Sequence, residues 1–95
     1  MPKRRLTPEE LVQLLSAIGE PTRIEIVNML ANQAMDVSSI AMNLGQSQPR
    51  VSRHLKILAV TGIVGGTRTG SRVTYDLCRD HPAMTIIGLV TPMGV

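Results

Sequence analysis

The stretch SQPRVSRHLKIL, residues 47–58, concentrates hydrogen-bond donors on what its spacing predicts to be a helix. Its apolar residues recur at i, i+4 and i+7, which places them on one face: Val51, Leu55 and Leu58. The polar side chains occupy the other faces: Ser47, Gln48, Arg50, Ser52, Arg53, His54 and Lys56. Such a helix can be anchored to a protein core on one side while it offers donors to a ligand on the other.

These donors are of the kinds that recognise duplex DNA. Glutamine can pair bidentately with adenine, arginine with the O6 and N7 atoms of guanine, and serine with either base. Lysine and arginine at the edges of the helix can hold phosphates. For His54, two roles stay open: contact with a phosphate, or bracing of the helix within the protein.

The segment before this stretch predicts the first half of a helix-turn-helix motif. Asp36 can cap a short helix whose apolar residues follow the i, i+3, i+4, i+7 pattern: Val37, Ile40, Ala41 and Leu44. Leu44-Gly45-Gln46 breaks that pattern, and Ser47 can cap the helix that follows. In a helix-turn-helix, which we place at about residues 36–61, the second helix enters the major groove and reads bases near its N-terminus.

Beyond Gly62 the apolar residues change from a helical period to alternation. Residues 63–67 and 72–77 predict two strands, joined by a turn at Thr69-Gly70-Ser71. The resulting hairpin, at about residues 63–78, carries two cations at its tip: Arg68 and Arg72. A winged helix uses a basic hairpin in this position on the neighbouring DNA backbone or minor groove.

Two helices are predicted before the motif. Thr7-Pro8-Glu9-Glu10 has the composition of a capped helix start, and Gly19 ends that helix. Its apolar residues form one stripe: Leu11, Leu14, Leu15 and Ile18. Pro21 opens the second helix, which ends near Asn32. Its inward row consists of Ile24, Val27 and Leu30. That row is widened by Ile26, Met29 and Ala31.

The last predicted helix starts at His81-Pro82 and runs from Ala83 to about Val90. It has almost no polar face, so it must lie in the core or pack against another subunit. We place a dimerisation helix at about residues 82–90.

Composition limits the possible partners. The length of 95 residues fits one domain, residues 1–95. The net charge is +3, but residues 50–79 hold six cations against one carboxylate, a local charge of +5. This suggests either an ordinary solvated surface or a face that meets a polyanion. Tyr75 is the only aromatic residue, which argues against RNA or single strands because these are bound by stacking. Double-stranded DNA is the partner that fits.

Several other classes are not expected. One cysteine, Cys78, excludes an internal disulfide framework and favours a cytoplasmic location. The N-terminus lacks the apolar region of a signal peptide, and no run of about 18 apolar residues predicts a membrane span. The two histidines, one cysteine and seven carboxylates form no nucleophile–base pair at a recognisable spacing, so we do not expect an enzyme.

The sequence resembles the ArsR/SmtB family of winged-helix bacterial repressors in three segments. LLSAIGEPTRIEIVNML (14–30) is similar to the family's helix that begins with Pro-Thr-Arg. SIAMNLGQSQPRVSRHLKILAVTGIV (39–64) is similar to its helix-turn-helix, and GTRTGSRVTYDL (66–77) to its wing. The resemblance covers about residues 11–78.

The resemblance implies a mainly α (α+β) winged helix-turn-helix of the order α-α-α-α-β-β-α, a homodimer through its first and last helices. It implies binding to an inverted-repeat operator, repression, and an effector that weakens DNA binding. The family's recognition-helix positions correspond here to Ser47, Gln48, Arg50, Ser52, Arg53 and His54, and its wing positions to Arg68 and Arg72.

The effector is where this chain departs from the family pattern. Asp36 and Ser38 stand where thiolate-sensing members carry Cys-x-Cys, so the resemblance predicts no soft-metal or arsenic site there. Cys78, Asp80 and His81 lie together before the last helix and could hold zinc or nickel, with a second chain contributing ligands. A small molecule or a partner protein is the other possibility for the effector.

Two functions are therefore carried forward. The first is a sequence-specific, dimeric DNA-binding repressor modulated by an effector. The alternative is a winged-helix protein-interaction module whose basic face binds an acidic partner.

Overall fold

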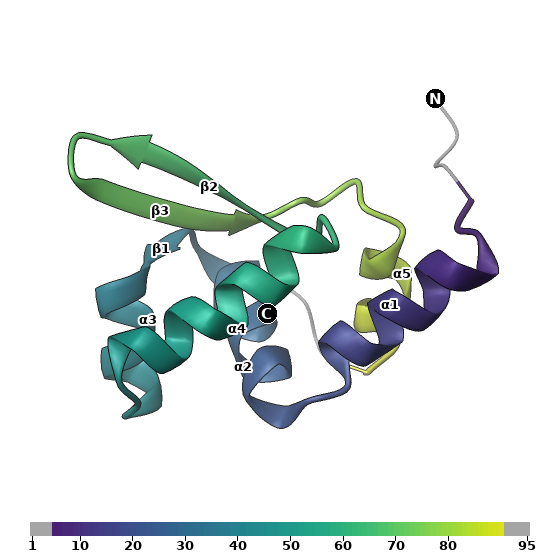
Figure 1. The fold of residues 1–95 in the computed structure, drawn as a ribbon, viewed down its shortest axis with the longest axis horizontal. Helices are drawn as coiled ribbons and strands as arrows, with labels where there is room; N and C mark the ends of the chain where they lie inside the picture. The colour runs from purple at the N-terminus through teal and green to yellow at the C-terminus, as the bar shows by residue number, and fades with distance from the viewer. Residues whose placement is uncertain (1–4, 91–95) are drawn as a thin grey trace.

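The computed structural model describes the backbone of residues 5–90 and the side chains of residues 5–88. Within this part, helices and strands follow in the order α1 (Pro8–Ile18), α2 (Pro21–Asn32), β1 (Met35–Asp36), α3 (Val37–Leu44), α4 (Gln48–Val60), β2 (Val64–Thr69), β3 (Arg72–Leu77) and α5 (Ala83–Val90). Figure 1 shows the β2–β3 hairpin projecting at one end of the molecule and α1 and α5 at the other. None of the helices in residues 5–90 is long and apolar enough to cross a membrane.

The predicted helix starts at Thr7, Pro21, Asp36 and Ser47 are confirmed, and all four have a side-chain cap, which for the helix that begins at Pro21 is Glu20. Thr7 and Glu10 form a reciprocal capping box, with bonds of 3.1 and 2.9 Å between each side chain and the other residue's backbone N–H. Asp36 accepts from the backbone N–H of Ser39, and Ser47 from that of Arg50. The turn between α3 and α4 depends on a glycine at position 45, where φ is 66°.

The sheet has three strands, where the sequence predicted two. All pairs are antiparallel and the strand order is β1-β3-β2, with Met35 opposite Tyr75 and Asp36 opposite Thr74. The observed order of elements is therefore α-α-β-α-α-β-β-α. Strand β1 was not predictable, because two residues directly before a helix are too few to show an alternating pattern. β2 also runs two residues further than predicted, to Thr69.

The core of the described residues is aliphatic. The apolar face of α4 is buried as predicted, since Val51, Leu55 and Leu58 are all 0 % exposed. On α2, Ile26 and Ala31 are buried whereas Ile24, expected to face inward, is only half-buried. The inward face of this helix is therefore rotated from the predicted row.

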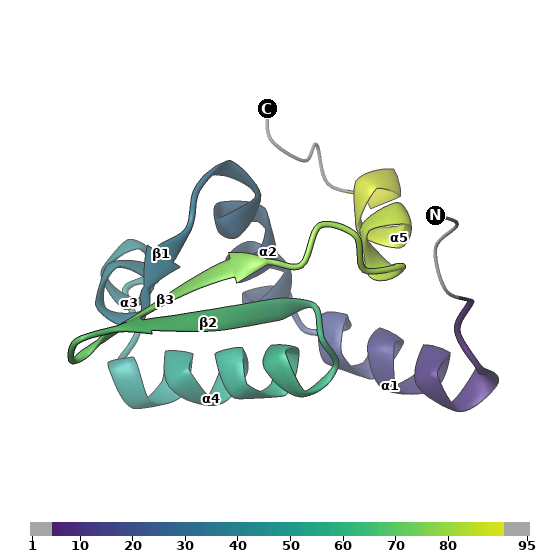
Figure 2. The same cartoon turned by 90° about the horizontal axis from the view of Figure 1, so that it is seen from above.

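The predicted single stripe of α1 is divided between core and surface. Leu14 and Ile18 are buried together with Ala17, but Leu11 and Leu15 remain 38 % and 46 % exposed. On α5, Ala83 and Ile87 are buried while Met84 and Ile86 are half-buried. Both helices thus use part of their apolar surface inside the chain and leave part of it uncovered at the same end of the molecule (Figure 2).

Candidate nucleic-acid interface

The recognition face lies on the N-terminal half of α4. Its predicted donors are exposed on the side opposite the buried row: Ser47, Gln48, Arg50, Ser52, Arg53 and Lys56. The hydroxyl oxygen of Ser47 accepts the 3.3 Å cap bond from Arg50 N–H, which leaves its own proton free to donate. The helix is therefore held from behind by aliphatic contacts and presents donors to solvent in front.

The hairpin lies beside this face. Figure 2 shows β2 running along α4, and the turn of the hairpin lies beyond the start of α4. A hollow of about 450 Å³ separates the two, with Gln48 and Ser52 on the helix side and Ser71 and Arg72 on the hairpin side. Ser38 also lines the hollow, and neither it nor Ser71 was predicted to contact DNA, because nothing in the residue spacing marks either serine. Because the hollow lies between them, the helix and the wing form two distinct contact surfaces.

Arg72, at the tip of the hairpin where β3 begins, is anchored by Asp36. Its Nε lies 3.5 Å from the Asp36 carboxylate, while 73 % of its side chain stays exposed. Hydrogen bonds from Ser39, with the charge of Arg72 adding to them, hold the pKa of the Asp36 carboxyl below its ordinary value. Asp36 therefore has two roles: it caps α3, and it holds Arg72 of the wing in position.

The remaining predicted cations are free of such partners. Within residues 5–88, Arg50, Arg53, Lys56 and Arg68 form no ion pair with another described side chain. By contrast, Arg79 pairs with Asp76 at 3.3 Å and donates to the carbonyl oxygens of Leu30 and Ala31 at the end of α2. The charge of the candidate interface is therefore available to an external anion, and that of Arg79 is used inside the fold.

His54 lies on the inner side of α4, with 17 % of its side chain exposed. Its Nδ1 is 3.3 Å from Nη1 of Arg23 and 3.6 Å from Oε2 of Glu20. A guanidinium can only donate, so Nδ1 accepts this bond and the ring proton is on Nε2. Of the two roles left open for His54, these contacts are those of a brace between α4 and α2.

Arg23 extends this brace to α1. Its Nε and Nη2 donate to the carbonyl oxygens of Ala17 and Ser16 at the end of α1. Burial raises the pKa of the Glu20 carboxyl, but backbone N–H bonds from Thr22 and Arg23 and the nearby positive charge of Arg23 lower it more, so the net pKa is below its ordinary value. Three helix segments therefore meet at one polar joint. Its partners lie far apart in the sequence, so residue spacing did not reveal it.

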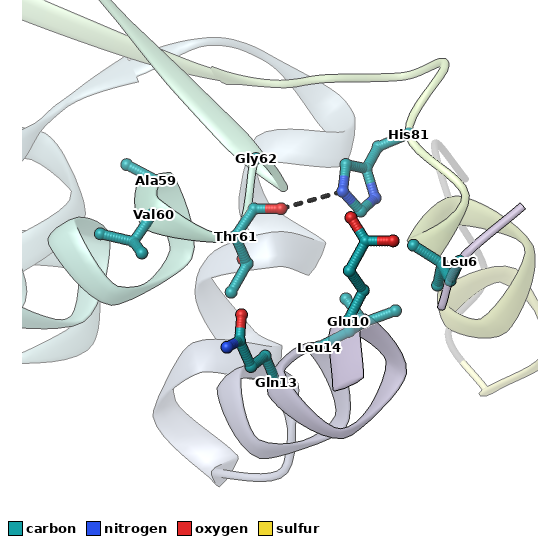
Figure 3. A pocket seen from close by; sticks show the side chains of 9 residues that line it. All are labelled: Leu6, Glu10, Gln13, Leu14, Ala59, Val60, Thr61, Gly62 and His81. Atoms are coloured by element: carbon teal, nitrogen blue, oxygen red, sulfur yellow. Dashed lines mark hydrogen bonds between the residues drawn. The ribbon is translucent and has the colours of Figure 1, made fainter. Parts of the chain in front are cut away.

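The proposed zinc or nickel ligands Cys78, Asp80 and His81 do not gather. No group of three or more potential metal ligands occurs among the described residues. His81 is also occupied: its Nε2–H donates to the carbonyl oxygen of Thr61 at 2.9 Å (Figure 3). Its Nδ1 accepts from Ala83 N–H at 3.0 Å. Both ring nitrogens thus connect the end of α4 to the start of α5 within the single chain.

Comparison with known proteins gives one consistent result. Residues 20–65 match the family model for bacterial regulatory proteins of the arsR family. The HTH-type transcriptional repressor SmtB of Mycobacterium tuberculosis is 39% identical over 82 residues, which cover 86% of this chain and 61% of that protein. The uncharacterized HTH-type regulator MJ1325 of Methanocaldococcus jannaschii is 37% identical over 74 residues, 77% of this chain and 83% of that protein. The chain spans only about three fifths of the length of SmtB.

Solved structures agree on the architecture. NolR from Sinorhizobium fredii matches with a TM-score of 0.80 and 28% identity, over 97% of this chain and 98% of that chain. A homodimeric winged helix-turn-helix DNA-binding domain from Mycobacterium bovis matches with a TM-score of 0.79 over 86% of this chain and 75% of that chain, at 24% identity. The predicted winged helix-turn-helix fold is confirmed, and the relatives named as regulators agree with the expectation that the chain is not an enzyme.

Proposed function

Because the chain belongs to the ArsR family of bacterial regulatory proteins, we propose that it is a sequence-specific, DNA-binding repressor of transcription that acts as a homodimer in the cytoplasm. One observation carries this proposal: the N-terminal half of α4 presents exposed donors without internal ion pairs, directly opposite an apolar row that is fully buried. A helix held in this way is suited to insertion into the major groove.

The contacts divide into base reading and phosphate binding. Gln48, Ser52 and Arg53 face outward from the first turns of α4, where a recognition helix meets base edges. Lys56 and Arg68 lie further along the helix and on the hairpin, and would neutralise phosphates on either side of the groove. Arg72 would bind a phosphate with its exposed guanidinium while Asp36 fixes its position.

Dimerisation would use the uncovered apolar surface at the opposite end of the molecule. Leu11 and Leu15 of α1 are exposed, and α5 lies at the same end of the molecule as α1. Burying them between two copies removes apolar area from water and places two α4 helices in symmetric positions. Two such helices about 34 Å apart would read half-sites one helical turn apart, which predicts an inverted-repeat operator.

The test is a fluorescence-anisotropy titration of the full chain with a palindromic fragment of its own promoter and with a random duplex of equal length. We expect tighter binding to the palindrome and a log K that falls with log[salt] by about 0.9 per neutralised phosphate. Binding without salt dependence would contradict a phosphate-contacting face. If neither duplex is retained at low salt, the basic face would instead serve an acidic protein partner.

A further inference from the structure

A second surface lies away from the candidate DNA interface, between α1 and the C-terminal half of α4. It is a groove of about 500 Å³ whose apolar lining includes Val12 and Ala17 from α1 and Ile57 and Val60 from α4. Val60 and Val12 are 80 % and 64 % exposed, so their apolar surface faces water in the single chain. None of the side chains proposed to contact DNA lines this groove.

One half-buried cation lines the same groove. Arg23 has five N–H donors, and three are used, by the carbonyl oxygens of Ser16 and Ala17 and by Nδ1 of His54. No carboxylate of residues 5–88 comes within ion-pair distance of the Arg23 guanidinium. Glu20 acts on Arg23 only from beyond ion-pair distance, and two N–H groups of the half-buried guanidinium remain to bind an external anion.

We propose that this groove binds a small amphipathic monocarboxylate, with its carboxylate on Arg23 and its aliphatic part along Val12, Ile57 and Val60. The combination of apolar walls with one cationic group selects this class over neutral or cationic amphiphiles. A volume of about 500 Å³ is in the range of small-molecule sites.

The position of the groove gives such a ligand a route to α4. Arg23 holds the carbonyl end of α1 and, through His54, the inner side of α4. Figure 3 shows the neighbouring part of this junction, where Gln13 of α1 points toward Thr61 at the end of α4. A carboxylate on the two free N–H groups of Arg23 draws the guanidinium toward the groove and away from His54, and so loosens the brace behind the recognition helix. This consequence rests on the proposed function, whereas ligand binding itself does not.

The binding experiment uses octanoate, with octanamide and octylammonium as probes of the same chain length. Each is titrated into the free, ¹⁵N-labelled full chain and followed by amide chemical shifts. We expect saturable shifts with octanoate at Val12, Arg23 and Val60, weaker ones with octanamide and none with octylammonium. Equal binding of octanoate and octylammonium, or no saturable shift with octanoate, would overturn the proposal.

Matched variants locate the site without removing Arg23, whose loss can unfold the joint. V60E places an anion in the groove and should weaken octanoate binding by at least about tenfold through like-charge repulsion, whereas V60K should retain it. M42E makes the same change at another 80 % exposed position, on α3, and should leave binding intact. Equal weakening by V60E and M42E, or none by V60E, would contradict the assignment.

Two further readouts separate the outcomes. Light scattering of wild type and V60E reports the oligomeric state. If V60E loses a dimer that the wild type forms, and the wild type does not bind octanoate, then a second copy of the chain fills the groove and the proposal is overturned. Octanoate added to the operator complex should lower the apparent DNA affinity in the wild type but not in V60E. Because the shift titration contains no DNA, failure of operator binding leaves the octanoate result interpretable.

Discussion

Two regions of the molecule use the same residue types in opposite ways. At the end formed by α3, the start of α4 and the hairpin, arginines such as Arg50 and Arg53 are exposed and have no internal ion pair within the described chain. Away from that end, Arg79 donates to the backbone carbonyls of Leu30 and Ala31 at the end of α2. The difference shows that partner groups, rather than residue type, separate side chains that bind from side chains that position.

The largest expected effect tests the anchoring of α4. Leu55→Ala should lower the free energy of unfolding by about 2–5 kcal/mol, because it removes a 0 % exposed side chain and leaves a cavity behind the recognition helix. Val60→Ala on the same helix, 80 % exposed, should change stability by less than about 0.5 kcal/mol. Urea unfolding followed by circular dichroism measures both. Similar losses would mean that the buried face does not anchor α4.

A pair of arginines tests the contrast directly. Arg53→Ala should weaken operator binding by about 1–3 kcal/mol and leave the unfolding midpoint unchanged. Arg79→Ala should do the reverse, since its hydrogen bonds lie inside the fold and are worth about 0.5–1.5 kcal/mol each. Anisotropy and thermal melts of the two variants provide the comparison. Loss of operator affinity in the Arg79 variant at unchanged stability would break the distinction.

Salt dependence distinguishes the two roles considered for His54. Lys56→Ala should reduce the slope of log K against log[salt] by about 1, as expected for one lost phosphate contact. His54→Ala should weaken binding through a displaced α4 with the slope preserved, because its Nδ1 bonds Arg23 rather than DNA. A reduced slope in the His54 variant would restore the phosphate contact as its role.

The smallest expected effect concerns acid. The folded-state pKa of Asp36 is depressed, so this carboxylate stabilises the fold above its unfolded-state pKa, and the contribution is lost as the pH falls through the folded-state value. Asp36→Asn should therefore flatten the loss of stability on acidification, as measured by urea titrations from neutral pH downward. Glu20 adds in the same direction, so the variant should keep part of the slope. Identical pH profiles for variant and wild type would exclude Asp36 as a contributor.

Local signals account for what the sequence predicted well. The caps at Thr7, Asp36 and Ser47 and the buried row of α4 depend on residues within one or two turns of each other. β1, the His54 brace and the His81 link depend instead on partners between 20 and 40 residues away. Spacing carries no information on such pairs, and so it did not show that the ring of His81, a candidate metal ligand with Cys78 and Asp80, bonds to Thr61. Exposure of the α4 donors was predictable, whereas the tethering of Arg72 was not.

The direct passage of β1 into α3 ties the wing to the first helix of the motif. Asp36 ends the strand, caps α3 and holds Arg72, while its neighbour Met35 pairs with Tyr75 on β3. A tilt of the hairpin therefore turns α3 as well. Operators whose minor groove is stiff or narrow under the wing would change the approach angle of the motif, so base pairs that no side chain touches would still contribute to operator choice.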